Sequence, residues 1–185
     1  MEAVSNKGSS VLCLADFAED SRTLDAKAFA EKHGGAFLLH HGPLQRLEPR
    51  SLDGSTLNLE TPSTVADVPF NPRHDFLVFP LRRKVDSVDE VIWLGQSESN
   101  DVVIPDASVS AIHAFVQVDH MNRYFIQDMN SRNGTKVSGQ KVPGHGHGKP
   151  VEMTVAADVE LGGRRMTFLP ASDFLNLVMR LFGGP

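Results

Sequence analysis

The pattern of apolar and polar positions changes near residue 76. Beyond it, short runs rich in β-branched and aromatic residues are separated by turn-forming residues at fairly even spacing, as in all-β sandwiches and barrels. Within 114–118, Ala114, Val116 and Val118 share one face, which predicts a strand with alternating sides. The predicted strands are residues 76–82, 88–94, 102–104, 113–118, 124–128, 135–137, 141–142, 159–161 and 166–169.

Two other segments have the spacing of amphipathic helices. Residues 26–33 carry apolar side chains at helical intervals, with Ser21 or Thr23 as the candidate N-cap. Residues 172–182 present a wide apolar face behind Ser172, which we expect to cap this helix. We expect the C-terminal helix to pack on the sandwich, and docking into a partner's groove is the alternative.

These patterns divide the chain into three parts. Residues 1–75 form an N-terminal extension with one helix, a short strand at 36–40 and a long loop or linker at 43–72. The core of this extension is small, so we expect it to dock on the sandwich, and disorder of part of it is the alternative. Residues 76–170 form the β domain, and residues 171–185 form the C-terminal helix.

Composition and charge exclude several classes of function. The chain has 185 residues, with 18 Lys and Arg against 23 Asp and Glu, so the formal net charge is -5. This balance argues against nucleic acid and anionic membranes as partners. No apolar run approaches the roughly 20 residues of a membrane-spanning helix. Together with the absence of a secretory signal, this predicts a cytoplasmic protein. The single cysteine excludes an internal disulfide and a multi-cysteine zinc site.

Polar residues recur at defined spacings between residues 95 and 135. Gly95 is followed by Asn-Asp-Val-Val at 100–103, by Ser110 with His113 three residues later, and by Asp-x-x-Ser-x-Asn-Gly-Thr at 128–135. Four such elements in this order resemble the forkhead-associated (FHA) domain over about residues 76–170. The resemblance implies a mainly β fold, a sandwich of about eleven strands whose loops at one end bind phosphothreonine peptides.

Binding a phosphate dianion requires several donors, preferably with a cation, because charge-assisted hydrogen bonds are the strong ones. Ser110 supplies a hydroxyl on a predicted loop, and Arg132 is a candidate cation. The resemblance implies that Asn133 holds the main chain of the peptide. It also implies that His113 braces the loops. Gly95 and Gly134 belong to the same motif and are expected to support the loops.

Gln96 departs from the family pattern. Domains of this family that bind phosphothreonine usually have Arg directly after the glycine that corresponds to Gly95. A hydrogen bond to a charged group contributes about 1.5 to 3 kcal/mol, so its loss would weaken binding by about 10- to 150-fold. The candidates to supply the missing positive charge are Arg132 and the basic run at residues 82–84.

We therefore predict a non-catalytic module that recognises a phosphothreonine-containing protein, the product of a Ser/Thr kinase. Its peptide contacts would be Ser110, Arg132, Asn133 and the altered position Gln96. The alternative is a degenerate domain that serves as a phosphorylation-independent scaffold. No catalytic motif, cofactor-binding loop or metal-ligand spacing accompanies these residues, so we predict no enzyme activity, no cofactor and no metal site.

Overall fold

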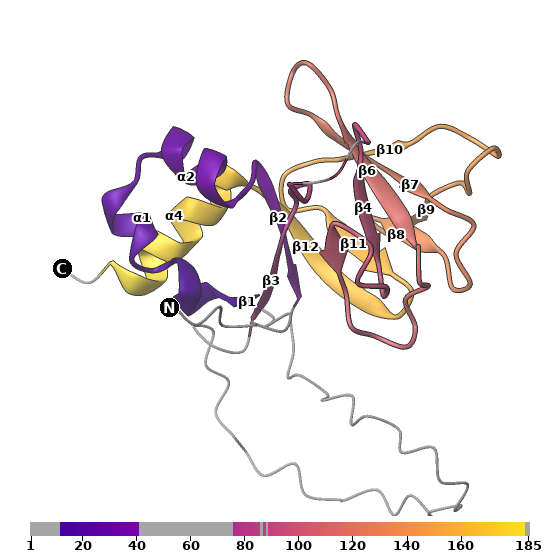
Figure 1. Ribbon diagram of the computed structural model, residues 1–185, viewed down its shortest axis with the longest axis horizontal. Helices are drawn as coiled ribbons and strands as arrows, with labels where there is room; N and C mark the ends of the chain where they lie inside the picture. The colour runs from indigo at the N-terminus through magenta and orange to yellow at the C-terminus, as the bar shows by residue number, and fades with distance from the viewer. Residues whose placement is uncertain (1–11, 41–75, 86, 88, 184–185) are drawn as a thin grey trace, which may run out of the picture.

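The computed structural model describes residues 12–40, 76–85, 87 and 89–183. Two β-sheets pack face to face, and a layer of helices covers the outer side of one sheet (Figure 1). The loop or linker that we predicted at residues 43–72 lies outside the described residues. No helix in the described part of the chain has the length and apolar character needed to cross a membrane.

The described residues form a seven-stranded and a five-stranded sheet. The larger has the order β1-β3-β2-β12-β11-β8-β9 and the smaller the order β10-β7-β6-β4-β5. The prediction of a β-sandwich of about eleven strands is therefore confirmed. The strands of the larger sheet are β1 (Leu12–Cys13), β2 (Ala36–His40), β3 (Leu77–Pro80), β8 (Thr135–Val137), β9 (Gln140–Lys141), β11 (Asp158–Leu161) and β12 (Arg164–Pro170). Those of the smaller sheet are β4 (Ile92–Gly95), β5 (Val102–Val103), β6 (Ala114–Val118), β7 (Tyr124–Asp128) and β10 (Val151–Met153).

Strand β2 lies between β3 and β12 and is buried on both faces. Ala36 and Leu38 face the core between the two sheets, whereas Phe37 and Leu39 face the helical layer. A strand that is covered on both sides reads as a continuous apolar run, which explains the sequence Ala-Phe-Leu-Leu. The N-terminal extension thus supplies an inner strand of the larger sheet in addition to covering its outer face.

The extension contains more helical structure than we predicted. Its helical segments are η1 (Leu14–Phe17), α1 (Asp20–Thr23) and α2 (Ala26–His33). The N-cap of α2 is Asp25, whose carboxylate accepts a 2.8 Å hydrogen bond from the amide of Ala28, so the assignment of Ser21 or Thr23 was wrong. Both of those residues belong to α1, a turn too short to show helical periodicity.

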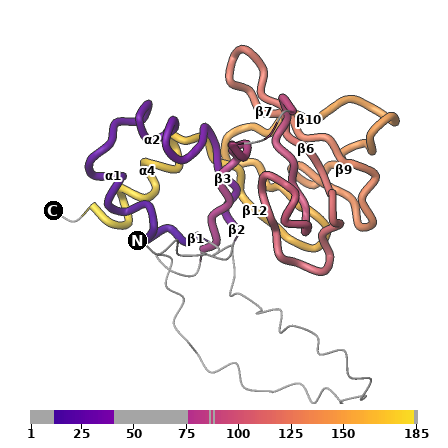
Figure 2. The backbone as a smooth tube through the Cα atoms, in the orientation of Figure 1, coloured from indigo at the N-terminus to yellow at the C-terminus, as the bar shows by residue number. Residues whose placement is uncertain are grey.

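The C-terminal helix, α4 (Ala171–Phe182), starts one residue earlier than we predicted. Its N-cap is Pro170, and Ser172 lies inside the helix, so the assignment of Ser172 as the cap was also wrong. Strand β12 runs directly into α4, which leaves no loop in which a capping serine could sit. Figure 2 shows the N-terminal trace in indigo beside the C-terminal trace in yellow, where α2 contacts α4.

Aromatic rings form the centre of the second core, between the helices and the larger sheet. Phe174 of α4 stacks on Phe37 of β2 with ring centroids 3.9 Å apart and planes inclined by 14°. Phe17 meets Phe174 edge to face at 5.0 Å, and Phe29 lies 6.1 Å from it. The apolar face of α4 is therefore used within the chain, as expected for a helix that packs on the sandwich.

Truncation of this aromatic cluster should destabilise the whole fold. We expect Phe174→Ala to lower the free energy of unfolding by about 3 to 5 kcal/mol, because the side chain is fully buried and its removal leaves a cavity. Urea unfolding followed by circular dichroism measures this loss. Met179→Ala, on the exposed side of the same helix, should change the stability by less than about 0.5 kcal/mol. Equal effects of the two substitutions would contradict the second core.

Candidate functional site

Three loops meet at one end of the sandwich. They follow β4, join β5 to β6, and join β7 to β8. The amide of Gln96 donates to the carbonyl of Ser110 at 2.9 Å, and the amide of Ser97 donates to that of Ala111 at 3.1 Å. These backbone hydrogen bonds place the exposed side chain of Gln96 in the loop that lies directly beside Ser110.

Gly95 and Asn100 hold the first loop against the second. The side-chain amide of Asn100 donates to the carbonyls of Ser97 and Ala111, each at 2.7 Å, and Asn100 is only 2% exposed. A Cβ atom on Gly95 would collide with the carbonyl oxygen of Ala111. Glycine is therefore required where the two backbones come together, and Asn100 fastens them from the interior.

His113 connects the second loop to the third. Its Nδ1 accepts a hydrogen bond from the amide of Ser110 at 3.0 Å, and its Nε2 donates to the carbonyl of Gly134 at 3.2 Å. This pair of bonds requires the neutral ring with the proton on Nε2. The residue is completely buried, and burial holds the pKa of its imidazole below 6.5.

Asp128 organises the third loop, which runs to Thr135. Its carboxylate accepts hydrogen bonds from the amide of Ser131 at 3.0 Å, from the hydroxyl of Ser131 at 2.6 Å and from the hydroxyl of Thr135 at 2.7 Å. The Ser131 hydroxyl oxygen in turn accepts from the amide of Gly134 at 3.1 Å. Gly134 has a φ of 78°, a conformation that favours glycine. The motif at 128–135 is thus a loop built around one carboxylate.

The third loop brings Arg132 and Asn133 to the second loop. The Ser110 hydroxyl oxygen accepts from the amide of Arg132 at 3.0 Å, which leaves its proton available to a ligand. The side-chain amide of Asn133 donates to the carbonyl of Ser108 at 2.7 Å. Arg132 and Asn133 are exposed, and the guanidinium of Arg132 has no hydrogen-bond partner among the described residues.

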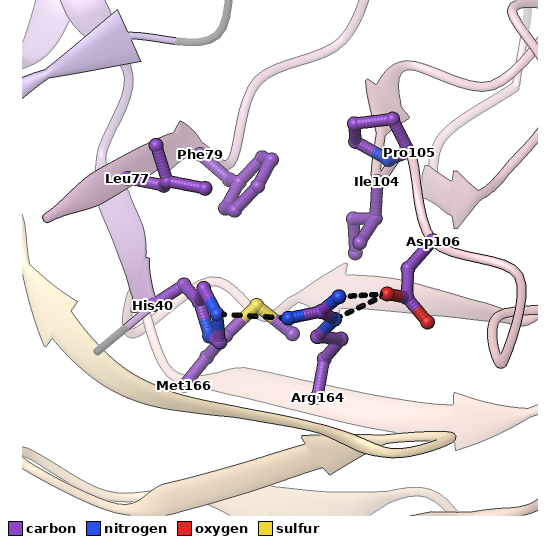
Figure 3. A pocket seen from close by; sticks show the side chains of 8 residues that line it. All are labelled: His40, Leu77, Phe79, Ile104, Pro105, Asp106, Arg164 and Met166. Atoms are coloured by element: carbon purple, nitrogen blue, oxygen red, sulfur yellow. Dashed lines mark hydrogen bonds and ion pairs between the residues drawn. The ribbon is translucent and has the colours of Figure 1, made fainter. Parts of the chain in front are cut away.

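A polar network behind Ser108 fixes the carbonyl that holds Asn133. Asp106 accepts from the amide of Ser108 at 2.8 Å, from its hydroxyl, and from the guanidinium of Arg164. Figure 3 shows Arg164 between Asp106 and His40, at the polar side of a pocket whose other walls are apolar. Burial alone would raise the pKa of Asp106, but the hydrogen bonds from Ser108 and Arg164 outweigh it and lower that pKa.

The structure brings together all the residues that we predicted for the site. Gln96, Ser110, Arg132 and Asn133 lie on the three joined loops, and Gly95, His113 and Gly134 are at the joints. Asp106 and Ser108 were not predicted from the sequence. An Asp-x-Ser spacing is common in turns, so it gave no signal that these residues support Asn133.

The basic run at residues 82–84 is largely engaged elsewhere. The guanidinium of Arg82 donates to the carbonyl of Lys32 at 2.8 Å, and that of Arg83 donates to the carbonyl of Asp89 at 2.7 Å. Lys84 alone reaches the loop after β4, where its ammonium group donates to the carbonyl of Glu98. Arg132 is therefore the better candidate to replace the charge that Gln96 lacks.

This arrangement is a β-sandwich with a preformed cluster of polar groups on loops at one end, which is the architecture of a recognition module. Residues 92–162 match the sequence model of the FHA domain. This match confirms the resemblance to the FHA domain that the motifs indicated. None of the curated proteins matches the chain.

Several solved structures are similar to part of this chain. The FHA domain of the CT664 protein from Chlamydia trachomatis is 27% identical, with a TM-score of 0.38, over 46% of this chain and 80% of that one. EmbR from Mycobacterium tuberculosis, solved with a low-affinity phosphopeptide, is 26% identical with a TM-score of 0.38. That match covers 44% of this chain, which spans only 20% of the EmbR chain.

The stability of the protein should depend on the protonation of His113. Because burial lowers the pKa of this imidazole in the folded state, the unfolded chain binds a proton more readily. The contribution of His113 is thus complete above about pH 6.5 and is lost as the pH falls from there through the folded-state pKa.

Urea unfolding measured from about pH 7.5 down to about pH 5, a range that spans the titration of histidine, tests this dependence. We expect His113→Gln to be less stable at neutral pH and to lose part of the decline with acid. His120→Gln, at an exposed histidine, should keep the full decline. An unchanged pH dependence in His113→Gln would show that another group causes it.

Proposed function

We propose that the protein is a non-catalytic interaction module that binds a phosphothreonine-containing segment of a signalling partner. The observation that carries this proposal is that the Ser110 hydroxyl, the Asn133 amide and the guanidinium of Arg132 lie on joined loops, and that this guanidinium has no partner among the described residues. Loops held by a rigid scaffold are common binding surfaces. The match of residues 92–162 to the FHA domain supports the same function.

Ser110 and Arg132 would hold the phosphate group. Phosphothreonine carries about -1.5 to -2 charges at neutral pH and three acceptor oxygens, so it needs donors rather than acceptors. The proton of Ser110 is available because the oxygen already accepts from the amide of Arg132. The Arg132 guanidinium can grip two phosphate oxygens at once, and Gln96 would add a neutral donor from the neighbouring loop.

Asn133 would hold the main chain of the peptide. Its amide nitrogen is fixed by the carbonyl of Ser108, and this bond sets the orientation of the side chain. The remaining carbonyl oxygen is a hydrogen-bond acceptor that a peptide amide beside the phosphothreonine can use. The partner would be the product of a Ser/Thr kinase, and we place both proteins in the cytoplasm.

Gln96 favours a second candidate, a phosphorylation-independent scaffold on the same fold. Gln96 is exposed and lacks the charge that an arginine would bring to the phosphate. The two functions differ in a simple way, because only the first requires the phosphate and the Ser110 hydroxyl.

Fluorescence anisotropy with a degenerate phosphothreonine peptide library and its unphosphorylated counterpart tests the proposal. We expect binding that requires the phosphate and falls by about 10- to 150-fold in Ser110→Ala and in Arg132→Gln, since each change removes a hydrogen bond to a charged group. Gln96→Arg should increase the affinity by a similar factor.

Lys27→Gln serves as the matched control, because it removes an exposed positive charge from α2, in the helical layer. It should bind as the unmodified protein does. Equal binding of the phosphorylated and unphosphorylated libraries would favour the scaffold function and overturn phosphothreonine recognition.

A further inference from the structure

A groove continues from the proposed peptide site toward strand β9. Its lining includes Arg132, Asn133 and Gly134 on the side of the third loop, and Lys141 and His147 on the other side. Lys141 belongs to β9, and its Cε atom lies about 3.9 Å from the position that a Cβ on Gly134 would occupy. The aliphatic part of Lys141 is thus close to the residue that follows Asn133.

Both cations of this groove lack an anionic partner in the part of the chain that the structure describes. Neither the guanidinium of Arg132 nor the ammonium group of Lys141 forms an ion pair or side-chain hydrogen bond with any described residue. Lys136, which pairs with Lys141 across the β8–β9 ladder, has its own carboxylate, Glu160, at 2.8 Å. Two positive charges in one groove therefore remain to be balanced from outside the described residues.

The groove has one carboxylate in its described lining, and that group is fully engaged. Asp128 is 4% exposed, and its oxygens accept hydrogen bonds from Ser131 and Thr135. It therefore presents little negative surface to a ligand. The electrostatic character of the groove is set by Arg132 and Lys141, which favours an anion.

The two walls are joined directly, so the groove is preformed. The amide of His145 donates to the carbonyl of Asp128 at 2.8 Å, and the Asn130 side chain donates to the carbonyl of His145 at 3.3 Å. The Gln127 side chain donates to the carbonyl of Pro143 at 2.5 Å. A binding surface that needs no rearrangement loses less free energy when it orders its ligand.

We infer that this groove binds an anionic side chain of the same peptide whose phosphothreonine occupies the proposed site, with Lys141 as the residue that determines this preference. The inference rests on the proposed function. A peptide held by Asn133 places its neighbouring residues beside the groove, within reach of Lys141. The anion is a carboxylate of Asp or Glu, or the phosphate of a second phosphorylated residue.

Phosphothreonine libraries with one further fixed residue test this subsite. At each flanking position the fixed residue is Glu, Gln or phosphoserine, and binding to the full chain is measured by fluorescence anisotropy. At one flanking position we expect Glu to bind about two- to fivefold more tightly than Gln, as for exposed ion pairs. Phosphoserine should exceed Gln by roughly tenfold or more, because it carries more charge and more acceptors.

Lys141→Gln should reduce two affinity ratios toward one, that of the Glu library to the Gln library and that of the phosphoserine library to the Gln library. It should leave the affinity of the Gln library itself nearly unchanged. Lys27→Gln is again the matched control and should keep both ratios. High salt should reduce the preference for Glu in the unmodified protein, because exposed charges are screened.

The outcomes separate the subsite from the function on which it rests. Phosphate-dependent binding of the Gln library with equal ratios in the unmodified protein and in Lys141→Gln overturns the subsite alone. Absence of phosphate-dependent binding in every library overturns both. A preference for phosphoserine without one for Glu supports the groove as a second phosphate site, and the reverse supports a carboxylate.

Discussion

The two hydrogen bonds of the buried His113 imidazole are the interaction on which the loops of the proposed peptide site depend. The ring accepts from the amide of Ser110 and donates to the carbonyl of Gly134, so it fixes two loops that are more than twenty residues apart in the chain. Only the neutral ring can make both bonds. Burial favours the neutral form because it lowers the pKa of the imidazole. The buried environment therefore keeps the ring in the form that makes both hydrogen bonds.

The seven-stranded sheet contributes to two cores, one between the two sheets and one between this sheet and the helical layer. Strand β2 sends Ala36 and Leu38 into the sandwich and Phe37 and Leu39 into the helical layer. Its last residue, His40, reaches the guanidinium of Arg164, which also contacts Asp106 (Figure 3). The N-terminal extension is therefore connected to the loop that holds Asn133. The connection runs from His40 through Arg164 to Asp106, which fixes Ser108.

The distribution of charge at the proposed peptide site differs from the pattern that the family motif leads one to expect. Gln96 is neutral where the family motif has an arginine beside Ser110, whereas Arg132 and Lys141 line the groove and have no anionic partner among the described residues. Positive charge is thus concentrated along the groove. In the proposed function, such a distribution makes the affinity depend on the residues that flank the phosphothreonine as well as on its phosphate.

The sequence by itself determined the loop motifs, whose order and spacing resemble the FHA domain. Asp128 bonds to residues three and seven positions away, so its motif lies within one short stretch of sequence. Gly95 was identified by the same resemblance, although the backbone that it approaches, at Ala111, belongs to the next loop. The tertiary structure decided the inner position of β2, the pairing of Asp106 with Arg164 and the placement of Lys141 beside Gly134. Each involves strands or loops that meet only when the sheets assemble, and local periodicity carries no information about such non-local pairing.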